Sequence, residues 1–373
     1  MTDENRHILH EVEALRGVAI LAVMAIHTTN PYTVLAGMSV LGVILMIANK
    51  IAGFAVPLFI FLSGFVLWAR YGNFFNLRWF YKKRARAILP VYVFATVFYT
   101  IALYFVNAKH FTAGTFLIDF LIGNTSYHLW FFILIMQFYL FYPILSRIFA
   151  RATQRRGGVL GLLGTTFAIQ CFWQFAIYGL ATAMHGRAGE LITLVLSRTV
   201  LSFIFYFFLG MFFKHSVSKV IQRITIFWRW CLALVAGSVT AVIVLATVLP
   251  SHSTGIRTFY SPVQWSVNTV GQVILNLCMI VLLYALVQQW AQTKKYFLRI
   301  LEKLGAASLG MYVLHVLLQI ILVKMLRQWG WLPDMWYVYP VLFVSNVIVS
   351  YYVVSLLGRF QFFRLLGIGA KIP

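Results

Sequence analysis

The chain has 373 residues, of which 62% are hydrophobic and only 10% are charged. Soluble proteins are about a quarter charged and at most half apolar, so this composition excludes an ordinary soluble domain. The net charge of +22 would suggest nucleic acid in a soluble protein, but its distribution along this chain points to a membrane protein.

Apolar runs of span length recur along the chain and predict an all-α, polytopic transmembrane helix bundle of about ten spans. The whole of 1–373 is expected to be one integral membrane domain. Run 40–69 is long and contains Gly53, which leaves open whether it forms one bent helix or two helices. Segment 107–126 is expected to hold a re-entrant or interfacial element. The candidate spans are 14–30, 40–69, 88–106, 127–149, 159–181, 194–213, 228–249, 266–290, 306–326 and 336–357.

Lysine and arginine gather on one side of this arrangement. With a cytoplasmic N-terminus, most of the 30 Lys and Arg residues fall in inner segments, and the outer segments hold only Lys109, Arg187, Arg257 and Arg327. This asymmetry follows the positive-inside rule and predicts that both termini are cytoplasmic. The expected partner of most of these cations is the anionic lipid of the bilayer, not nucleic acid.

The first span carries two ionisable residues, Arg16 and His27, about three helical turns apart and therefore on one face. Such groups at membrane depth usually face a bundle interior or a water-filled cavity. Glu13 is spaced to pair with Arg16, and a histidine titrates near neutrality, which suits a general base. The alternatives are a snorkelling anchor at Arg16 and a hydrogen-bonded bundle residue at His27.

Two further stretches follow. Ser63 and Gly64 are small residues in an aromatic helix, and close helix packing is the favoured explanation for them. The basic run that contains Lys83, Arg84 and Arg86 is suited either to lipid headgroups or to a phosphate socket, because the arginine fork matches phosphate oxygens.

The remaining polar positions lie in later spans. His128 and Trp130 suit either an aromatic belt or a substrate opening, and Gln137 and Tyr139 follow on the same helix. Another stripe is formed by Ser308, Tyr312 and His315, at helical spacings of four and three, where function and a satisfied buried histidine are both open.

Taken in order, these stretches resemble the acyltransferase-3 family, bacterial-type integral membrane enzymes that transfer acyl groups, commonly acetyl, to sugars of cell-surface glycans. The resemblance covers nearly the whole chain. It rests on the Leu15-Arg16-Gly17 opening with His27, the Phe61-Leu62-Ser63-Gly64-Phe65 stretch, the run ending Arg84-Ala85-Arg86, the Leu129-Trp130-Phe131 stretch with Phe138, Tyr139 and Pro143 downstream, and the late Ser308, Tyr312 and His315.

The resemblance implies roles for these residues. His27 would be the essential histidine and Arg16 its cytoplasmic partner, with Glu13 at the family's acidic position before the Leu-Arg pair. Acyl-coenzyme A, first of all acetyl-CoA, would be the donor, and no permanently bound cofactor or metal is expected. The donor would meet Arg84, Arg86, Lys83 and Ser63; the acceptor or its path would meet His128, Trp130, Gln137, Tyr139, Ser308, Tyr312 and His315.

The chain departs from the family pattern at Ile135 and Met136, where many members carry a carboxylate. The implied acceptor is a glycan or lipid-linked sugar, and the implied location is the bacterial cytoplasmic membrane. Oligomerisation and envelope-synthesis partners stay open. The rival hypothesis is a transporter or flippase for a lipid-linked or polymeric glycan, and a structural subunit of an envelope-synthesis complex is a third.

Overall fold

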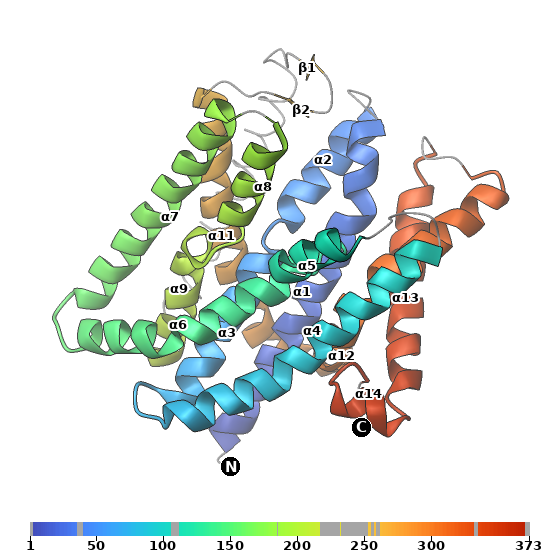
Figure 1. Cartoon of the computed structure of the whole chain (residues 1–373). Helices are drawn as coiled ribbons and strands as arrows, with labels where there is room; N and C mark the ends of the chain where they lie inside the picture. The colour runs from blue at the N-terminus through green and yellow to red at the C-terminus, as the bar shows by residue number, and fades with distance from the viewer. Residues whose placement is uncertain are drawn as a thin grey trace. The chain divides into compact units, whose positions relative to one another are not determined.

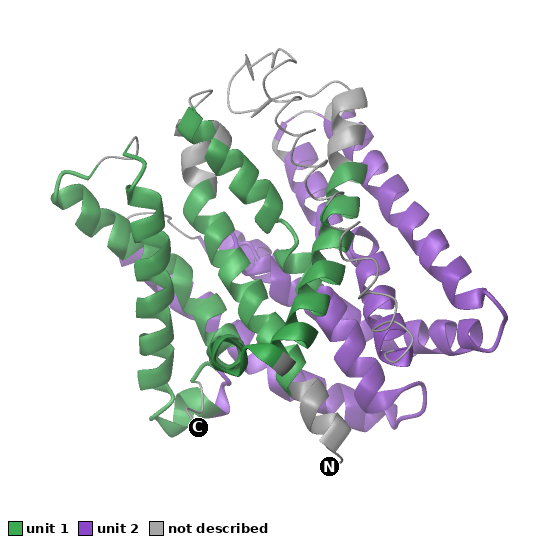
Figure 2. Cartoon of the chain, turned by 180° about the vertical axis from the view of Figure 1, so that it is seen from behind, with its two compact units in different colours: residues 1–59, 218–364, 368–373 green, residues 60–217, 365–367 purple. Residues whose placement is uncertain are grey.

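A computed structural model gives the fold of residues 3–35, 40–105, 112–184, 186–216, 232, 253–254, 257–258, 262–331 and 335–369. The chain divides into two compact units, unit 1 with residues 1–59, 218–364 and 368–373, and unit 2 with residues 60–217 and 365–367 (Figure 2).

Unit 1 is built from long helices and one very short hairpin (Figure 1). Strands β1 and β2 are antiparallel, with Ser253 opposite Thr258. The elements of unit 1 are α1 (Asp3–Leu35), α2 (Val40–Ala52), β1 (Ser253–Thr254), β2 (Arg257–Thr258), α11 (Pro262–Thr293), α12 (Lys295–Gln328), α13 (Val338–Leu357) and most of α14 (Gln361–Leu365).

Helix α3 (Ala55–Tyr71) begins in unit 1 and belongs to unit 2 from Ile60 onward. The other elements of unit 2 are α4 (Leu77–Phe105), α5 (Ala113–Ile122), α6 (Trp130–Thr153), α7 (Gly158–Ala183), α8 (Gly186–Ser197), the 3₁₀ turn η1 (Val200–Ser202) and α9 (Ile204–His215).

The predicted all-α polytopic fold is confirmed. Within the described ranges, 8 stretches are long and apolar enough to cross a membrane. The predicted span 228–249 lies outside the described residues except for residue 232, and the total of ten spans and the side of the termini stay predictions. The 8 stretches are His10–Thr29, Val40–Tyr71, Leu77–Phe105, Trp130–Thr153, Gly158–Ala181, Val270–Ala291, Lys295–Gln328 and Val338–Leu357.

The long run 40–69 forms two helices, α2 and α3, that meet in a turn at Gly53 and Phe54. The end of α2 is held from α11, where Gln272 Nε2 donates to the Lys50 carbonyl over 3.1 Å. The Lys50 carbonyl also accepts from the Gly53 amide over 3.2 Å, so it is bonded both within its own turn and from α11. Segment 107–126 contains the short apolar helix α5, capped at its start by Thr112 and ended by Gly123 in the left-handed region at φ 71°.

The candidate span 194–213 is not one continuous helix. Helix α8 ends at Ser197, η1 follows, and α9 begins only at Ile204. Side chains of α6 and α7 replace the missing helix bonds. Gln137 donates to the Arg198 carbonyl and accepts from the Val200 amide, and Gln170 accepts from the Phe205 amide. Hydropathy alone could not reveal this break, since the replacement partners lie far away in sequence.

Helices α1 and α12 pack together at the centre of unit 1 through glycines. A Cβ added to Gly17 would lie 2.1 Å from the Leu301 carbonyl oxygen, and one added to Gly305 would lie 1.8 Å from that of Glu13. Both positions therefore exclude any side chain, and the two backbones are in direct contact. Gly310 makes a similar approach to Ile368, so α12 is closely packed on two sides.

Helices α3 and α9 make the corresponding crossing in unit 2. A Cβ on Gly64 would lie 2.1 Å from the Phe207 carbonyl oxygen, and one on Gly210 would lie 1.9 Å from that of Phe61. The packing function predicted for Gly64 is therefore supported. Aromatic rings surround this crossing, with Phe61 and Phe213 edge to face at 5.0 Å between ring centres.

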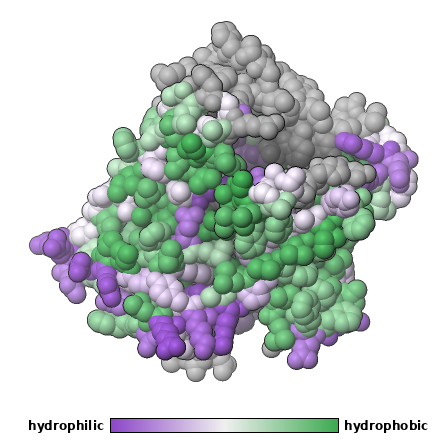
Figure 3. Space-filling view, in the orientation of Figure 1, coloured by the Kyte–Doolittle hydropathy of each residue, from purple (hydrophilic) through white to green (hydrophobic). Residues whose placement is uncertain are grey.

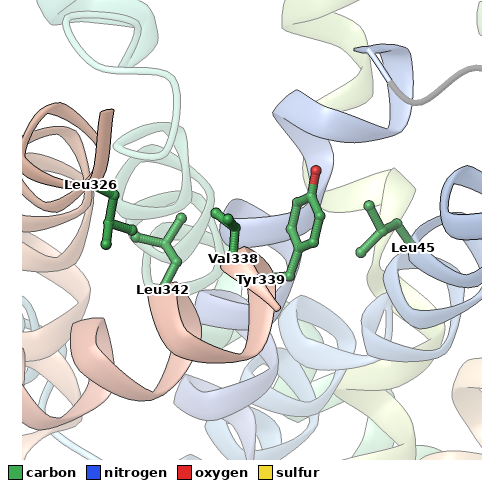
Figure 4. Packing of buried hydrophobic residues seen from close by; sticks show 5 residues of the cluster. All are labelled: Leu45, Leu326, Val338, Tyr339 and Leu342. Atoms are coloured by element: carbon green, nitrogen blue, oxygen red, sulfur yellow. The ribbon is translucent and has the colours of Figure 1, made fainter. Parts of the chain in front are cut away.

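Apolar packing closes one end of unit 1 and apolar surface covers much of the exterior. A cluster of buried residues joins the end of α12 to α13 and α2, with Leu326 beside Leu342 at one side and Leu45 beside Tyr339 at the other (Figure 4). Figure 3 shows apolar side chains over much of the visible face, with hydrophilic ones in separate patches. On α4, Val93, Val97 and Ile101 are about half exposed at a spacing of one helical turn, as a lipid-facing stripe requires.

Candidate functional site

His27 on α1 meets His315 on α12 inside unit 1. Their ring centres lie 5.1 Å apart and the ring planes are inclined at 35°. His27 is half-buried, whereas His315 is fully buried, with 0% of its surface exposed. The same two helices are closely packed at Gly17 and Gly305, which precede the two histidines on their helices.

The orientation of His315 is fixed by its own helix. Its Nδ1 lies 2.9 Å from the Tyr312 carbonyl oxygen and 3.1 Å from that of Met311. Because a carbonyl only accepts, Nδ1 carries the hydrogen, and in the neutral ring the lone pair is then on Nε2. Tyr312 packs beside it, with ring centres 6.0 Å apart.

Arg16 and Ser308 join the same two helices at a second point, where Arg16 Nη2 donates to Ser308 Oγ over 2.9 Å. Residue numbers rise together on the two helices, from Arg16 with Ser308 to His27 with Gln319, so α1 and α12 run parallel. The predicted face of α1 and the predicted stripe of α12 are thus brought together. The predicted pairing of Glu13 with Arg16 stays a prediction; the Glu13 backbone lies against Gly305.

Several amide side chains of unit 1 were not singled out from the sequence. Gln319, 6% exposed, donates from Nε2 to the His27 carbonyl over 2.8 Å. Asn49 of α2 donates to Thr29 Oγ1 over 3.1 Å, and on α13 Ser350 donates to the fully buried Asn346. Their only signal in the sequence is an uncharged amide within an apolar helix, which belongs to no motif.

Arg84 in unit 2 is surrounded by aromatic rings. Its guanidinium carbon lies 5.1 Å from the ring centre of Tyr71, 5.4 Å from that of Tyr139 and 5.9 Å from that of Phe80. Arg84 Nη2 also donates to the Tyr71 hydroxyl. Cation–π contacts of this kind hold a guanidinium in place with its charge partly desolvated.

The other basic residues of this run differ from Arg84. Lys83 Nζ lies 4.5 Å from the Trp79 ring centre, and Arg86 is exposed. Ser63 is half-buried on α3, one residue before the Gly64 contact. Arg84 and Arg86, which the sequence placed in one basic run, therefore have different surroundings: aromatic rings enclose Arg84, and Arg86 is exposed.

The aromatic stretch at the start of α6 is also built into unit 2. His128 is 1% exposed, its Nδ1 lies 3.0 Å from Ser126 Oγ, and its ring meets the Tyr99 ring edge to face at 4.9 Å. Trp130 stacks on Phe203 in the α8–α9 break, with the Arg198 guanidinium 5.6 Å from its ring centre.

The predicted site residues divide between the units. Glu13, Arg16, His27, Ser308, Tyr312 and His315 belong to unit 1, and the predicted donor residues Ser63, Lys83, Arg84 and Arg86 and the stretch from His128 to Tyr139 belong to unit 2. In unit 1 the candidate base His27 lies next to His315, whose ring is oriented by its own helix. In unit 2 the guanidinium of Arg84 is held by aromatic rings, and Arg86, two residues later, is exposed.

Comparison with known proteins adds the family. A family model described as an acyltransferase domain, that of the acyltransferase-3 family, matches residues 9–355 and thus runs through both units. Comparisons with curated proteins and with solved structures gave no match. The match covers His27, the Arg84–Arg86 run and the His315 stripe, the residues whose geometry is described above. The chain therefore belongs to the acyltransferase-3 family and is a multi-pass membrane acyltransferase.

Proposed function

We propose that this protein transfers an acyl group, most simply acetyl, from cytoplasmic acyl-CoA to a hydroxyl of a cell-envelope or extracellular glycan, with His27 as general base. The bacterial cytoplasmic membrane is the proposed location. The observation that carries the proposal is the pair of contacts between α1 and α12, a cation at Arg16 and an imidazole at His27, on one face of one helix.

The spacing of these two groups fits the shape of an acyl-CoA. Along α1 they are separated by about 16.5 Å of helical rise. Acyl-CoA is long, carries its phosphates at one end and its thioester at the other, and would enter from the side where basic residues gather. The expectation from the sequence that Arg84 and Arg86 contact the phosphates stays a prediction; it depends on the planar fork through which arginine binds phosphate.

The chemical step needs one base and one proton transfer. His27 takes the proton of the acceptor hydroxyl while the oxygen attacks the thioester carbonyl carbon. The carbon–sulfur bond then breaks, the ester forms, and the coenzyme A thiolate takes the proton back from the imidazolium of His27. Each proton and each bond is accounted for without a further reactant.

The decisive experiment uses purified protein in detergent, radiolabelled acetyl-CoA and a panel of glycan acceptors. H27A should lower the transfer rate by at least about 10²-fold, the usual contribution of a general base, while the protein elutes as the wild type does in size-exclusion chromatography. The matched control is H10Q on the same helix, because the His10 side chain is 58% exposed and contacts Glu302 at the surface.

The outcomes separate the alternatives. Transfer that survives H27A overturns the role of His27, and glycan movement across liposomes without any acyl transfer favours a transporter or flippase. Label that stays on the protein when the acceptor is omitted, and that H27A abolishes, identifies an acyl-histidine intermediate in place of direct transfer.

A further inference from the structure

Lys50 is a cation within the candidate membrane span Val40–Tyr71, in the last turn of α2. Its side chain is half-buried, and among the described residues its ammonium group takes part in no hydrogen bond and no ion pair. A charge at membrane depth is costly, and such residues usually face the bundle interior and mark the path of a substrate or an ion. The ordinary alternative is a cation that stabilises the negative end of the α2 dipole.

Lys50 does not belong to the lipid-facing stripe of α2. Val40 and Ile44 are 79% and 56% exposed, and Ala48, one further turn along, is exposed as well. Lys50 comes two residues after Ala48, which is about 200° around the helix. The lysine side chain therefore leaves α2 on a different side from the one that faces lipid.

The end of α2 is fixed at the depth of His27. Asn49 Nδ2 donates to the Ile26 carbonyl over 3.3 Å and to Thr29 Oγ1 over 3.1 Å, and these two α1 residues lie on either side of His27 in the chain. Lys50 is the next residue after Asn49, with its Cα about 3.8 Å away. The ammonium group, on its flexible four-carbon stem, is thus anchored at the depth where the proposed base lies.

No carboxylate lies at this depth on the described part of unit 1, where acidic side chains occur only on α1 and α12. Glu13, on α1, is separated from Ile26 by about 20 Å of helical rise. Glu302, on α12, is separated by about 25 Å from Gln319, which bonds the His27 carbonyl. The charge of Lys50 is therefore placed where an anion from outside the chain could bind it.

The donor does not supply an anion at this depth. In the proposed complex the phosphates of acyl-CoA lie toward Arg16, and the thioester that lies beside His27 is uncharged. An anionic partner of Lys50 would then belong to the acceptor. A lysine ammonium binds such a group as a point charge, and it suits the oxygens of a carboxylate or of a phosphate.

We propose that Lys50 binds an anionic group of the acceptor, a carboxylate or a phosphate, and that the acceptor glycan is therefore acidic. This inference rests on the proposed function and names its substrate class. The hydroxyl that receives the acyl group lies next to His27, while the acidic group of the same or a neighbouring sugar pairs with Lys50. Lys50 keeps its proton throughout, and no bond is made or broken on it.

The test uses the full-length protein in detergent with radiolabelled acetyl-CoA and three matched acceptors. These are a neutral glucose tetrasaccharide, the same compound with one sugar oxidised to glucuronic acid, and its 6-phosphate, so that carboxylate and phosphate are compared directly. The wild type should use at least one acidic acceptor with a kcat/KM at least about tenfold above that for the neutral one. K50M should raise KM for that acidic acceptor by about tenfold or more, with the neutral acceptor within about twofold, and K50R should keep the preference.

The matched control is K324M, because Lys324 belongs to the candidate span Lys295–Gln328 of the same unit and its side chain is exposed. It should match wild type with all three acceptors. Binding is also read without transfer, from the melting temperature in the presence of each acceptor. The preferred acidic acceptor should raise the melting temperature of wild type and K324M but not of K50M. Should K50M not be recovered as folded protein, K50Q, which also removes the charge, is judged by the same criteria.

The inference is overturned if the wild type prefers the neutral acceptor, or if K50M keeps the wild-type preference. An equal fall in kcat for all three acceptors in K50M also overturns it and indicates stabilisation of the transition-state oxyanion instead. Where no acceptor is turned over, the melting temperatures decide, and an equal response of wild type and K50M overturns it. Failure of the proposed function is separate, because it shows as transfer that survives H27A.

Discussion

The α1–α12 crossing of unit 1 and the α3–α9 crossing of unit 2 use the same device and differ in what surrounds it. In each, two glycines bring helix backbones within a distance that excludes even a methyl group. Around the first lie Arg16, Ser308 and the two histidines; around the second lie phenylalanine rings, with Phe138 stacked on Phe207 at 4.6 Å.

The difference shows that close approach by itself carries no chemistry. Small residues at an interface allow tight packing in any membrane bundle. Of the two crossings, as far as the described residues show, the one in unit 1 brings ionisable groups of two helices into contact, and the proposed base lies there. In unit 2 the charged group described above is the Arg84 guanidinium, which lies over the rings of Tyr71 and Tyr139.

The largest effect is expected from breaking either crossing. In G305A the new Cβ would lie 1.8 Å from the Glu13 carbonyl oxygen, and in G210A it would lie 1.9 Å from that of Phe61. Each should lower the free energy of unfolding by about 3 kcal/mol, the upper end for overpacking, seen as a lower melting temperature in detergent.

The control for both is G164A on α7, where an added Cβ meets nothing within 4 Å. Alanine is about 1 kcal/mol better than glycine in a helix interior, so G164A should not lower the melting temperature. A melting temperature for G305A equal to that of wild type would show that the α1–α12 contact can widen without loss.

A smaller effect is expected from the two arginines, and it should differ between them. R84M removes the cation from three rings and the hydrogen bond to Tyr71, which should cost about 2 kcal/mol of stability. R86M, at an exposed position, should leave stability within about 0.5 kcal/mol of wild type. Both should raise KM for acetyl-CoA if both bind its phosphates, and equal melting temperatures would contradict the structural difference.

A loss smaller than that of R84M is expected at the polar contact between Arg16 and Ser308. S308A removes the acceptor for Arg16 and should cost about 1 kcal/mol, as interhelical hydrogen bonds in membranes do. S308T keeps a hydroxyl and should restore part of that loss in a thermal unfolding experiment. If S308A and S308T melt together with wild type, the contact between Arg16 and Ser308 contributes nothing to the packing of α1 on α12.

Sequence patterns predicted which residues share a face of one helix, but not which helix faces contact each other. Helical spacing placed Arg16 with His27 on one face and Ser308, Tyr312 and His315 on another, but nothing in the sequence paired those two faces. That pairing depends on backbone contact at Gly17 and Gly305, which lie far apart in the chain. Apolar composition likewise indicated the membrane spans.

Other features could not be predicted for a related reason. A hydropathy window sees that 194–213 is apolar, but not that Gln137 and Gln170 satisfy a break within it. Grouping Arg84 with Arg86 by their spacing could not reveal that Tyr71 and Tyr139 enclose only the first. In both cases the deciding partners come from other helices.

The break between α8 and α9 has a consequence for how the protein is made. Gln137 and Gln170, whose side chains bond peptide groups of the break, and Trp173, whose Nε1 donates to the Leu196 carbonyl over 3.2 Å, are all translated before residue 198 leaves the ribosome. The interrupted segment can therefore meet ready partners as it enters the lipid. If α6 and α7 followed the break in the chain, its peptide groups would lack these hydrogen bonds in the lipid until those helices were synthesised. Each peptide group without a hydrogen bond in hydrocarbon costs several kcal/mol.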